Sequence, residues 1–127
     1  MTTNTEKTLQ ASDLNHFTGS EHWYRHWASP NITYTDGVKY LADKGGAYWL
    51  IDEVALENRF SNNKLLGNAE FQVWKLVRDK EGHGANLIVE DGDYNELFRK
   101  RIEFTDFPLP EITLWFTDNV ILLPSEY

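Results

Sequence analysis

The chain has 127 residues, of which 41% are hydrophobic and 14% aromatic, and it contains no cysteine. This length and composition indicate one folded domain, while the lack of cysteine excludes disulfides, thiolate nucleophiles and thiolate metal ligands. The formal net charge of −8 opposes binding along a phosphate backbone, so a nucleic-acid ligand is not expected. An acidic surface suits a basic partner or mimicry of nucleic acid.

The start of the chain is polar. We expect residues 1–8 to form a flexible tail and residues 9–127 to form a single domain. No long apolar run follows the tail, so neither a signal peptide nor a membrane span is expected. We therefore predict a cytoplasmic protein without membrane contact.

Two short helices are predicted after the tail. The first spans 9–17, where apolar residues recur on one side. Ser20 is suited to cap the second helix, at 21–27, because its hydroxyl can accept a hydrogen bond from a backbone amide of the first turn. Several residues of the second helix belong to types enriched at protein interfaces, although core packing of its two tryptophans is the alternative. The candidate interaction surface consists of Trp23, Tyr24, Arg25, His26 and Trp27.

The segment that leads to Gly45 allows two structures. A hairpin turning at Asp36 fits the alternation of apolar residues as far as Tyr40. A helix over 36–44, capped by Thr35 or Asp36 and stopped by Gly45, fits a helical spacing that continues through the whole segment. We prefer the helix for that reason.

A helix with two apolar faces is predicted at 47–60 and should lie at the centre of the fold. One face contains Leu50 and Val54, and the nearly opposite face contains Trp49 and Phe60. We expect the first face to pack on a C-terminal sheet. The second should meet the N-terminal helices or a second subunit.

After this helix the pattern changes to strands. Strands are predicted at 71–77, 86–90 and 97–104, followed by a hairpin that turns at Asp118 and Asn119. Both faces of that hairpin are apolar, so it should be central in the sheet or covered by another subunit. The predicted fold class is α+β, with N-terminal helices packed on a C-terminal antiparallel β-meander in a single domain.

Three runs of sequence carry a family resemblance. The run YTDGVKYLA at 34–42, followed by GAYWLID at 46–52, resembles an uncharacterised family of small bacterial proteins described as a domain of unknown function. The run LNHFTG at 14–19 is similar too, so the resemblance covers most of the chain. It implies no activity, and no functional residue transfers with it.

Four groups of polar residues are candidates for chemistry. His22 and His26 would stand one turn apart on a helix, but no third ligand accompanies them, so no metal site is expected. The turn at 91–95 begins like a calcium loop but lacks the glycine and the glutamate that such a loop requires. The basic run at 99–101 should form charge pairs with neighbouring strands, and the carboxylates of the central helix should face water.

The leading functional hypothesis is a small, non-enzymatic protein-binding module with an interaction or regulatory role. We expect it to form a homodimer and to need no cofactor, and the sequence does not identify its protein partner. The alternative is an enzyme or small-ligand binder with a pocket between the central helix and the sheet. The candidate residues of that pocket are Tyr48, Trp49, Asp52 and Trp115.

Overall fold

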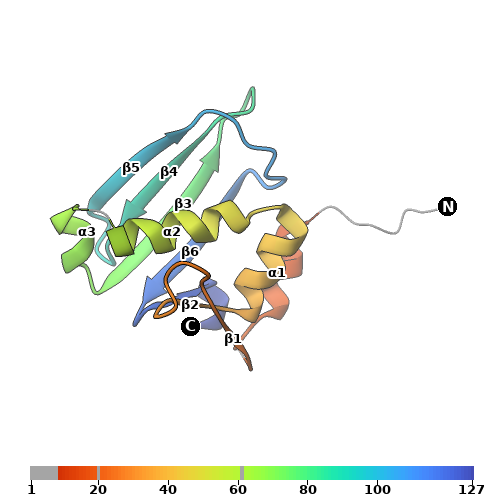
Figure 1. Cartoon of the computed structure of the whole chain (residues 1–127). Helices are drawn as coiled ribbons and strands as arrows, with labels where there is room; N and C mark the ends of the chain where they lie inside the picture. Colours follow the sequence, from red (N-terminus) through yellow and green to blue (C-terminus); the bar gives the residue numbers. More distant parts are fainter. Residues whose placement is uncertain (1–8, 20, 61) are drawn as a thin grey trace.

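A computed structural model of the chain describes residues 9–19, 21–60 and 62–127. The predicted tail at 1–8 and the predicted cap Ser20 lie outside these residues. The fold belongs to the α+β class, because its helices pack together against a sheet of mostly antiparallel strands (Figure 1).

The described elements follow one another with strands at both ends of the chain and the α-helices between them. In chain order they are the 3₁₀-helix η1 (Ala11–His16), β1 (Trp23–Arg25), β2 (Thr33–Thr35), α1 (Asp36–Gly45), α2 (Tyr48–Phe60), α3 (Lys64–Asn68), β3 (Phe71–Arg78), β4 (Ala85–Glu90), β5 (Glu96–Ile102), β6 (Glu111–Thr117), β7 (Val120–Leu122) and the 3₁₀-helix η2 (Pro124–Glu126).

The segment with two predicted structures is the helix α1. Its N-terminus is capped by Thr35, whose Oγ1 accepts a hydrogen bond from the amide of Val38. Its C-terminus is closed by Gly46, which adopts the left-handed conformation with φ 61°. The helix prediction is confirmed, although Gly45, the predicted stop, is the last residue of the helix and Gly46 closes it.

The predicted central helix is α2, and one of its two apolar faces is closed. Leu50 and Val54 are buried against the sheet, as predicted. Trp49 packs partly against the core, whereas Phe60 on the second face is 64% exposed. The N-terminal helices therefore do not cover the end of that second face.

The predicted helix at 21–27 is wrong, because β1 occupies its centre. Trp23 pairs with Thr35 and Tyr24 pairs with Tyr34 in an antiparallel ladder. Aromatic and β-branched side chains pack well on a pleated surface, and β2 supplies such a surface beside β1. The helical spacing at 21–27 carries no information about this partner.

The described strands form one seven-stranded sheet in the order β1-β2-β7-β6-β3-β4-β5. All neighbours are antiparallel except β2 and β7, which are parallel. The predicted arrangement, with N-terminal helices on a C-terminal meander, is therefore not what is found. Two N-terminal strands join the sheet, and β6 pairs with β3 instead of β5.

The final hairpin is formed as predicted. Asp118 and Asn119 have φ values of 52° and 62°, which is the conformation of a two-residue turn whose twist matches the strands. Phe116 pairs with Ile121 on one side of the hairpin. The hairpin is central, since β7 pairs with β2 on one side and β6 pairs with β3 on the other.

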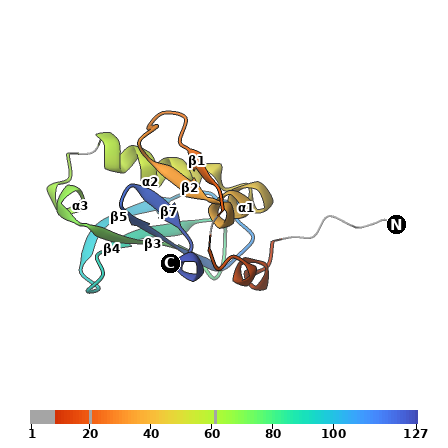
Figure 2. The same ribbon diagram turned by 90° about the horizontal axis from the view of Figure 1, so that it is seen from below.

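The α-helices lie on one side of the sheet (Figure 2). Beneath them the strands bury a continuous core that includes Trp74, Leu76 and Leu114. The side chains of Gln72 and Asn58 exchange two hydrogen bonds, of 2.7 and 3.0 Å, that join β3 to α2. We call the opposite side of the sheet the open face.

None of the helices in the described part of the chain combines the length and apolarity that a membrane span requires.

Candidate functional site

The open face carries a row of paired residues that crosses the sheet from β1 to β4. Successive side chains of a strand alternate between the two faces of the sheet. Leu114 is buried on the helix side, so its neighbour Trp115 lies on the open face. The residues that pair with Trp115 on adjacent strands lie on the same face. In the part of the chain that the structure describes, the only helical segments on this face are the short η1 and η2 (Figure 2). The row consists of Trp23, Thr35, Leu122, Trp115, Val73 and Glu90.

Three aromatic rings form a cluster at the middle of the open face. The ring centroids of Phe71 and Trp115 are 5.1 Å apart, and those of Trp115 and Tyr127 are 5.4 Å apart. The rings meet edge to face, which is the arrangement that aromatic pairs favour. Tyr127 remains 77% exposed, so the cluster presents apolar surface to its surroundings.

A hollow of about 480 Å³ lies beside this cluster. Its apolar lining includes Phe71, Val73 and Trp115 from β3 and β6. An ion pair forms part of the wall, with Lys75 Nζ 2.9 Å from Glu90 Oε1. The hollow is therefore mainly apolar, with this ion pair and the carboxylate of Asp91 in its wall.

The turn between β4 and β5 forms the outer wall of this hollow. Tyr94 in this turn is 84% exposed and has φ 68°, in the left-handed region. Asp91 fixes the turn: its carboxylate accepts from the amides of Asp93 and Asn95 at 2.8 and 3.0 Å, and from Asn95 Nδ2 at 2.9 Å. The hydrogen bonds from Asn95 lower the pKa of Asp91. The resemblance to a calcium loop thus reflects an ordinary turn whose aspartate binds backbone amides.

A second, smaller hollow lies near the opposite edge of the same face. Its volume is about 210 Å³, and it lies between β1 and β7. Trp23, Thr35, Val120 and Leu122 line it, and so does Tyr127 of the aromatic cluster. The turn that carries Tyr94 therefore lies near the β5 edge of the open face, and this smaller hollow lies near the β1 edge.

The cations near the open face are already paired with carboxylates. Arg99 lies 2.7 Å from Glu96, and Arg101 lies 2.6 Å from Asp79. The hydrogen bonds that Arg101 donates lower the pKa of Asp79. The basic run does form charge pairs, but not with neighbouring strands as predicted: Glu96 belongs to the same strand and Asp79 to the turn after β3. Lys100, on the other face of the sheet, pairs with Glu53 of α2.

A family model described as "Family of unknown function (DUF6876)" matches residues 8–127. The chain belongs to this family. The match confirms the resemblance found in the sequence, and the family brings no assigned activity with it. Neither the curated proteins nor the solved structures contain a match to the chain.

In this family member the predicted interaction surface is divided between the two sides of the sheet. Trp23 and Arg25 lie on the open face, because they pair with Thr35 and Thr33. Tyr24 points to the helix side, where its hydroxyl donates to Asp36 at 3.0 Å. The five residues therefore do not form one surface, as the predicted helix would have required.

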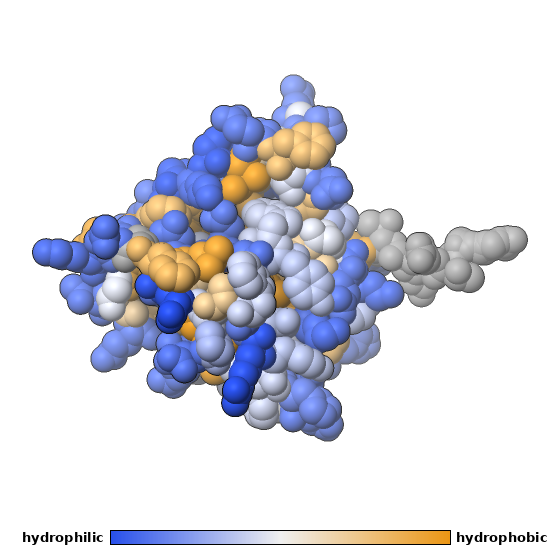
Figure 3. Space-filling view, in the orientation of Figure 1, coloured by the Kyte–Doolittle hydropathy of each residue, from blue (hydrophilic) through white to orange (hydrophobic). Residues whose placement is uncertain are grey.

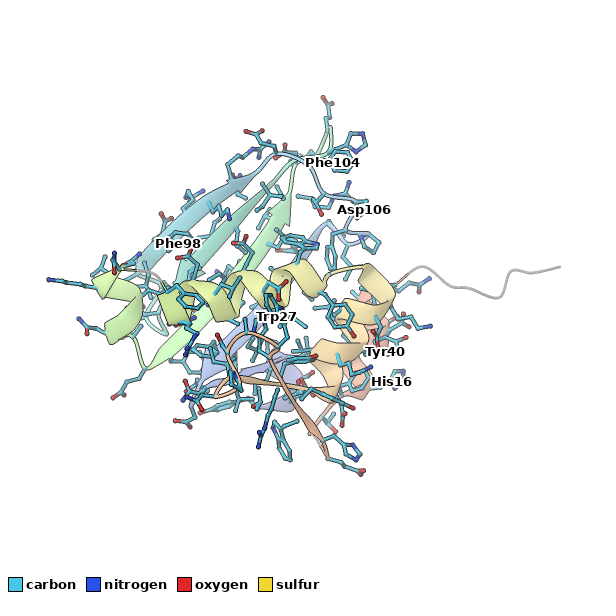
Figure 4. The ribbon with its side chains drawn as sticks, in the orientation of Figure 1. His16, Trp27, Tyr40, Phe98, Phe104 and Asp106 are labelled. Atoms are coloured by element: carbon cyan, nitrogen blue, oxygen red, sulfur yellow. The ribbon has the colours of Figure 1, made fainter. Side chains whose placement is uncertain are left out.

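The last two residues of that predicted surface contact α2. His26 is buried, whereas Trp27, which lies beside α2 in Figure 4, is 78% exposed. Both rings donate a hydrogen bond to Asp52, at 2.7 and 2.9 Å. The other ring nitrogen of His26, Nδ1, accepts from the amides of Ala28 and Ser29 at 3.1 and 3.2 Å. This ring therefore acts as a bracket between the loop after β1 and the central helix. Figure 3 shows this helix side, where hydrophilic residues surround smaller apolar areas.

The two histidines considered as a metal pair do not converge. His22 lies 3.7 Å from Asp36, whereas His26 binds Asp52. Among the described residues, no three side chains of the metal-binding types come together.

The predicted pocket between α2 and the sheet does not bring its four residues together. Trp115 lies on the open face, across the sheet from α2, and Asp52 is occupied by His26. Tyr48 donates to Asp43 of α1, and this hydrogen bond raises the pKa of Tyr48 to about 12. Trp49 packs partly against the core. A hollow of about 540 Å³ does lie between the helices and the sheet, but Asn58, Leu66, Gln72 and Phe116 line it in place of the four expected residues.

Sequence reasoning missed three aromatic residues of the open face, namely Phe71, Tyr94 and Tyr127. Phe71 alternates with the buried Gln72, so its face was detectable in principle once the pairing of β3 with β6 was known. The sequence does contain a signal for Tyr94: a bulky aromatic residue is unusual in a turn, where small polar residues such as Asp93 and Asn95 are common.

Proposed function

We propose that this chain is a non-enzymatic protein-binding module that binds through the open face of its sheet, and that its partner on this face is a second copy of itself. One observation carries the proposal. The aromatic cluster of Phe71, Trp115 and Tyr127 lies on the side of the sheet opposite the helices. A sheet that is apolar on both sides is most stable when both are covered, and contiguous exposed apolar surface marks interaction sites.

The apolar area of the open face, and not its charge, favours a second copy as the partner. Two chains of net charge −8 repel one another. Lys75, Arg99 and Arg101 each have a carboxylate partner, whereas Asp91 and Asp118 add negative charge to the linings of the two hollows. Packing two such faces together in the manner of a β-sandwich buries apolar area, and this gain must outweigh the repulsion between the carboxylates.

The side chains that an acid–base enzyme would use are engaged in structural contacts. Both nitrogens of His26 have hydrogen-bond partners, and Asp52 accepts from two rings. Glu53 binds Lys100 at 2.7 Å. These contacts support a binding role for the protein.

Sedimentation velocity over a wide concentration range tests the proposal. The 14.8 kDa chain should sediment as a reversible dimer, and Trp115→Glu should weaken the dimer at least about thirtyfold, as expected for a hot-spot aromatic. Phe60→Glu is the matched control, because Phe60 is 64% exposed at the end of α2, on the helix side of the sheet. A monomeric wild-type protein at high concentration, or equal weakening by both variants, would contradict the proposal. Circular dichroism of each variant verifies that it is folded.

A second candidate function is small-ligand binding in the larger hollow of the open face. Its volume of about 480 Å³ lies in the range of roughly 300–1,000 Å³ that is usual for ligand sites. Ligands that raise the Tm of a monomeric wild-type protein, and fail to do so after Val73→Trp fills the hollow, would favour this function over self-association.

A further inference from the structure

We infer that the dimer is a two-fold sandwich in which Tyr94 of each copy inserts into the smaller hollow, between β1 and β7, of the other copy. This inference rests on the proposed function and specifies its geometry. It is carried by the conformation of Tyr94, the rigidity of its turn, the size of the hollow, and the positions of both on the open face.

Tyr94 has a left-handed backbone conformation, which glycine, aspartate and asparagine adopt more readily than tyrosine. Its φ of 68° lies in the left-handed region, which disfavours a bulky side chain. Gly92, Asp93 and Asn95 tolerate that conformation more readily, yet the turn places the tyrosine there. Such strain is typical of a residue that is held in position for a contact. In the single chain the side chain is 84% exposed.

The turn that carries Tyr94 is fixed before any partner arrives. Asp91 accepts three hydrogen bonds from Asp93 and Asn95, and its own amide donates to the carbonyl of Asn95 at 3.0 Å. A pre-ordered loop loses little conformational entropy on binding. An exposed ring on such a turn is therefore well suited to serve as an anchor.

The hollow between β1 and β7 fits one aromatic ring. Its volume is about 210 Å³, and a cavity of about 150 Å³ is already sufficient for benzene. Trp23, Val120 and Leu122 supply apolar walls. Asp118 at the rim supplies a carboxylate to which a tyrosine hydroxyl can donate.

The turn and the hollow are placed so that a two-fold axis between two copies of the chain can bring each turn to the hollow of the other copy. Trp23 lies at the β1 edge and Tyr94 follows β4 near the β5 edge, so the two lie on opposite sides of the central strand β6. They also lie at the same end of the strands, because the row from Trp23 through Trp115 reaches Glu90, which directly precedes the turn. A two-fold axis parallel to the strands places the β5 edge of one copy over the β1 edge of the other. Both insertions then form at once, as an isologous interface requires.

Cysteine cross-linking tests this geometry without background, because the chain contains no cysteine. Full-length Tyr94→Cys and Trp23→Cys variants are mixed and gently oxidised. The mixture should form a disulfide-linked dimer, whereas each variant alone should not, since two copies of the same position lie at opposite edges of the sandwich. The matched control replaces Tyr94→Cys by Phe104→Cys. Phe104 is also exposed, but it contacts His83 in the turn at the other end of the strands.

Sedimentation velocity of Tyr94→Ala separates failure of this inference from failure of the proposed function. The inference requires the dissociation constant to rise at least about tenfold, while Phe104→Ala leaves it unchanged. A wild-type dimer that is weakened by Trp115→Glu but not by Tyr94→Ala, and that yields no mixed cross-link, would overturn the inference and leave the proposed function in place. A monomeric wild-type protein would overturn both.

Discussion

Replacement of His26 by alanine should destabilise the fold more than any other histidine substitution in the described chain. The side chain of His26 is 1% exposed and has three hydrogen-bond partners, the amides of Ala28 and Ser29 and the carboxylate of Asp52. Its Nδ1 accepts the hydrogen bonds from the two amides, so the proton of the ring is on Nε2, which donates a hydrogen bond to Asp52. Alanine removes all three contacts together.

The size of the effect follows from the burial of each partner. Ser29 is buried, so its amide loses its acceptor away from water, at a cost of about 1–3 kcal/mol. Asp52 is 37% exposed and keeps the hydrogen bond from Trp27, so the lost bond to the carboxylate contributes only ~1 kcal/mol. We expect His26→Ala to lower the free energy of unfolding by about 3 kcal/mol in total, which corresponds to a Tm decrease of roughly 10 °C.

Urea unfolding followed by circular dichroism measures this difference. His22→Ala is the matched control, because His22 is exposed and lies 3.7 Å from its carboxylate partner; it should change stability by less than about 0.5 kcal/mol. Asp52→Asn retains an acceptor for both rings and should lower stability by less than about 1 kcal/mol. If His26→Ala were no more destabilising than His22→Ala, the bracket between the loop and α2 would carry no stability.

Two further predictions concern tyrosines. The phenolate absorbance assigned to Tyr48, by difference from Tyr48→Phe, should titrate near pH 12, and Asp43→Asn should return it toward 10. Because the folded pKa is raised, the associated stability is fully present below pH 10 and is lost as the pH rises to about 12; an ordinary titration near 10 would refute the hydrogen bond to Asp43. Tyr94→Asn should raise the free energy of unfolding of the monomer by about 1 kcal/mol, because asparagine accepts the left-handed conformation. A decrease in the urea midpoint would show that Tyr94 is not strained.

The elements that the sequence predicts correctly are those with local signals. Thr35 and Gly46 mark the ends of α1, and the turn at Asp118 and Asn119 aligns the last two strands. Each signal depends on residues that are near one another in the chain. The buried side of α2 is likewise predicted by the helical spacing of its apolar residues alone.

The elements that it misses depend on distant partners. β1 is a strand because β2 lies beside it, and β2 is held by its parallel pairing with β7, far along the chain. The meander fails for the same reason, since β6 pairs with β3 across two intervening strands. The candidate pocket combined Trp49 and Trp115, whose separation by the sheet follows only from that pairing.

The helix side and the open face are coupled through β1. This strand is three residues long, and within the described residues its ladder is formed with β2. Tyr24 binds Asp36 on the helix side, and His26 directly after the strand binds Asp52 of α2. These contacts hold the backbone from which Trp23 extends onto the open face as a wall of the smaller hollow. Loss of the His26 bracket should therefore loosen that wall, so that a residue buried under the helices contributes to assembly on the opposite side of the sheet.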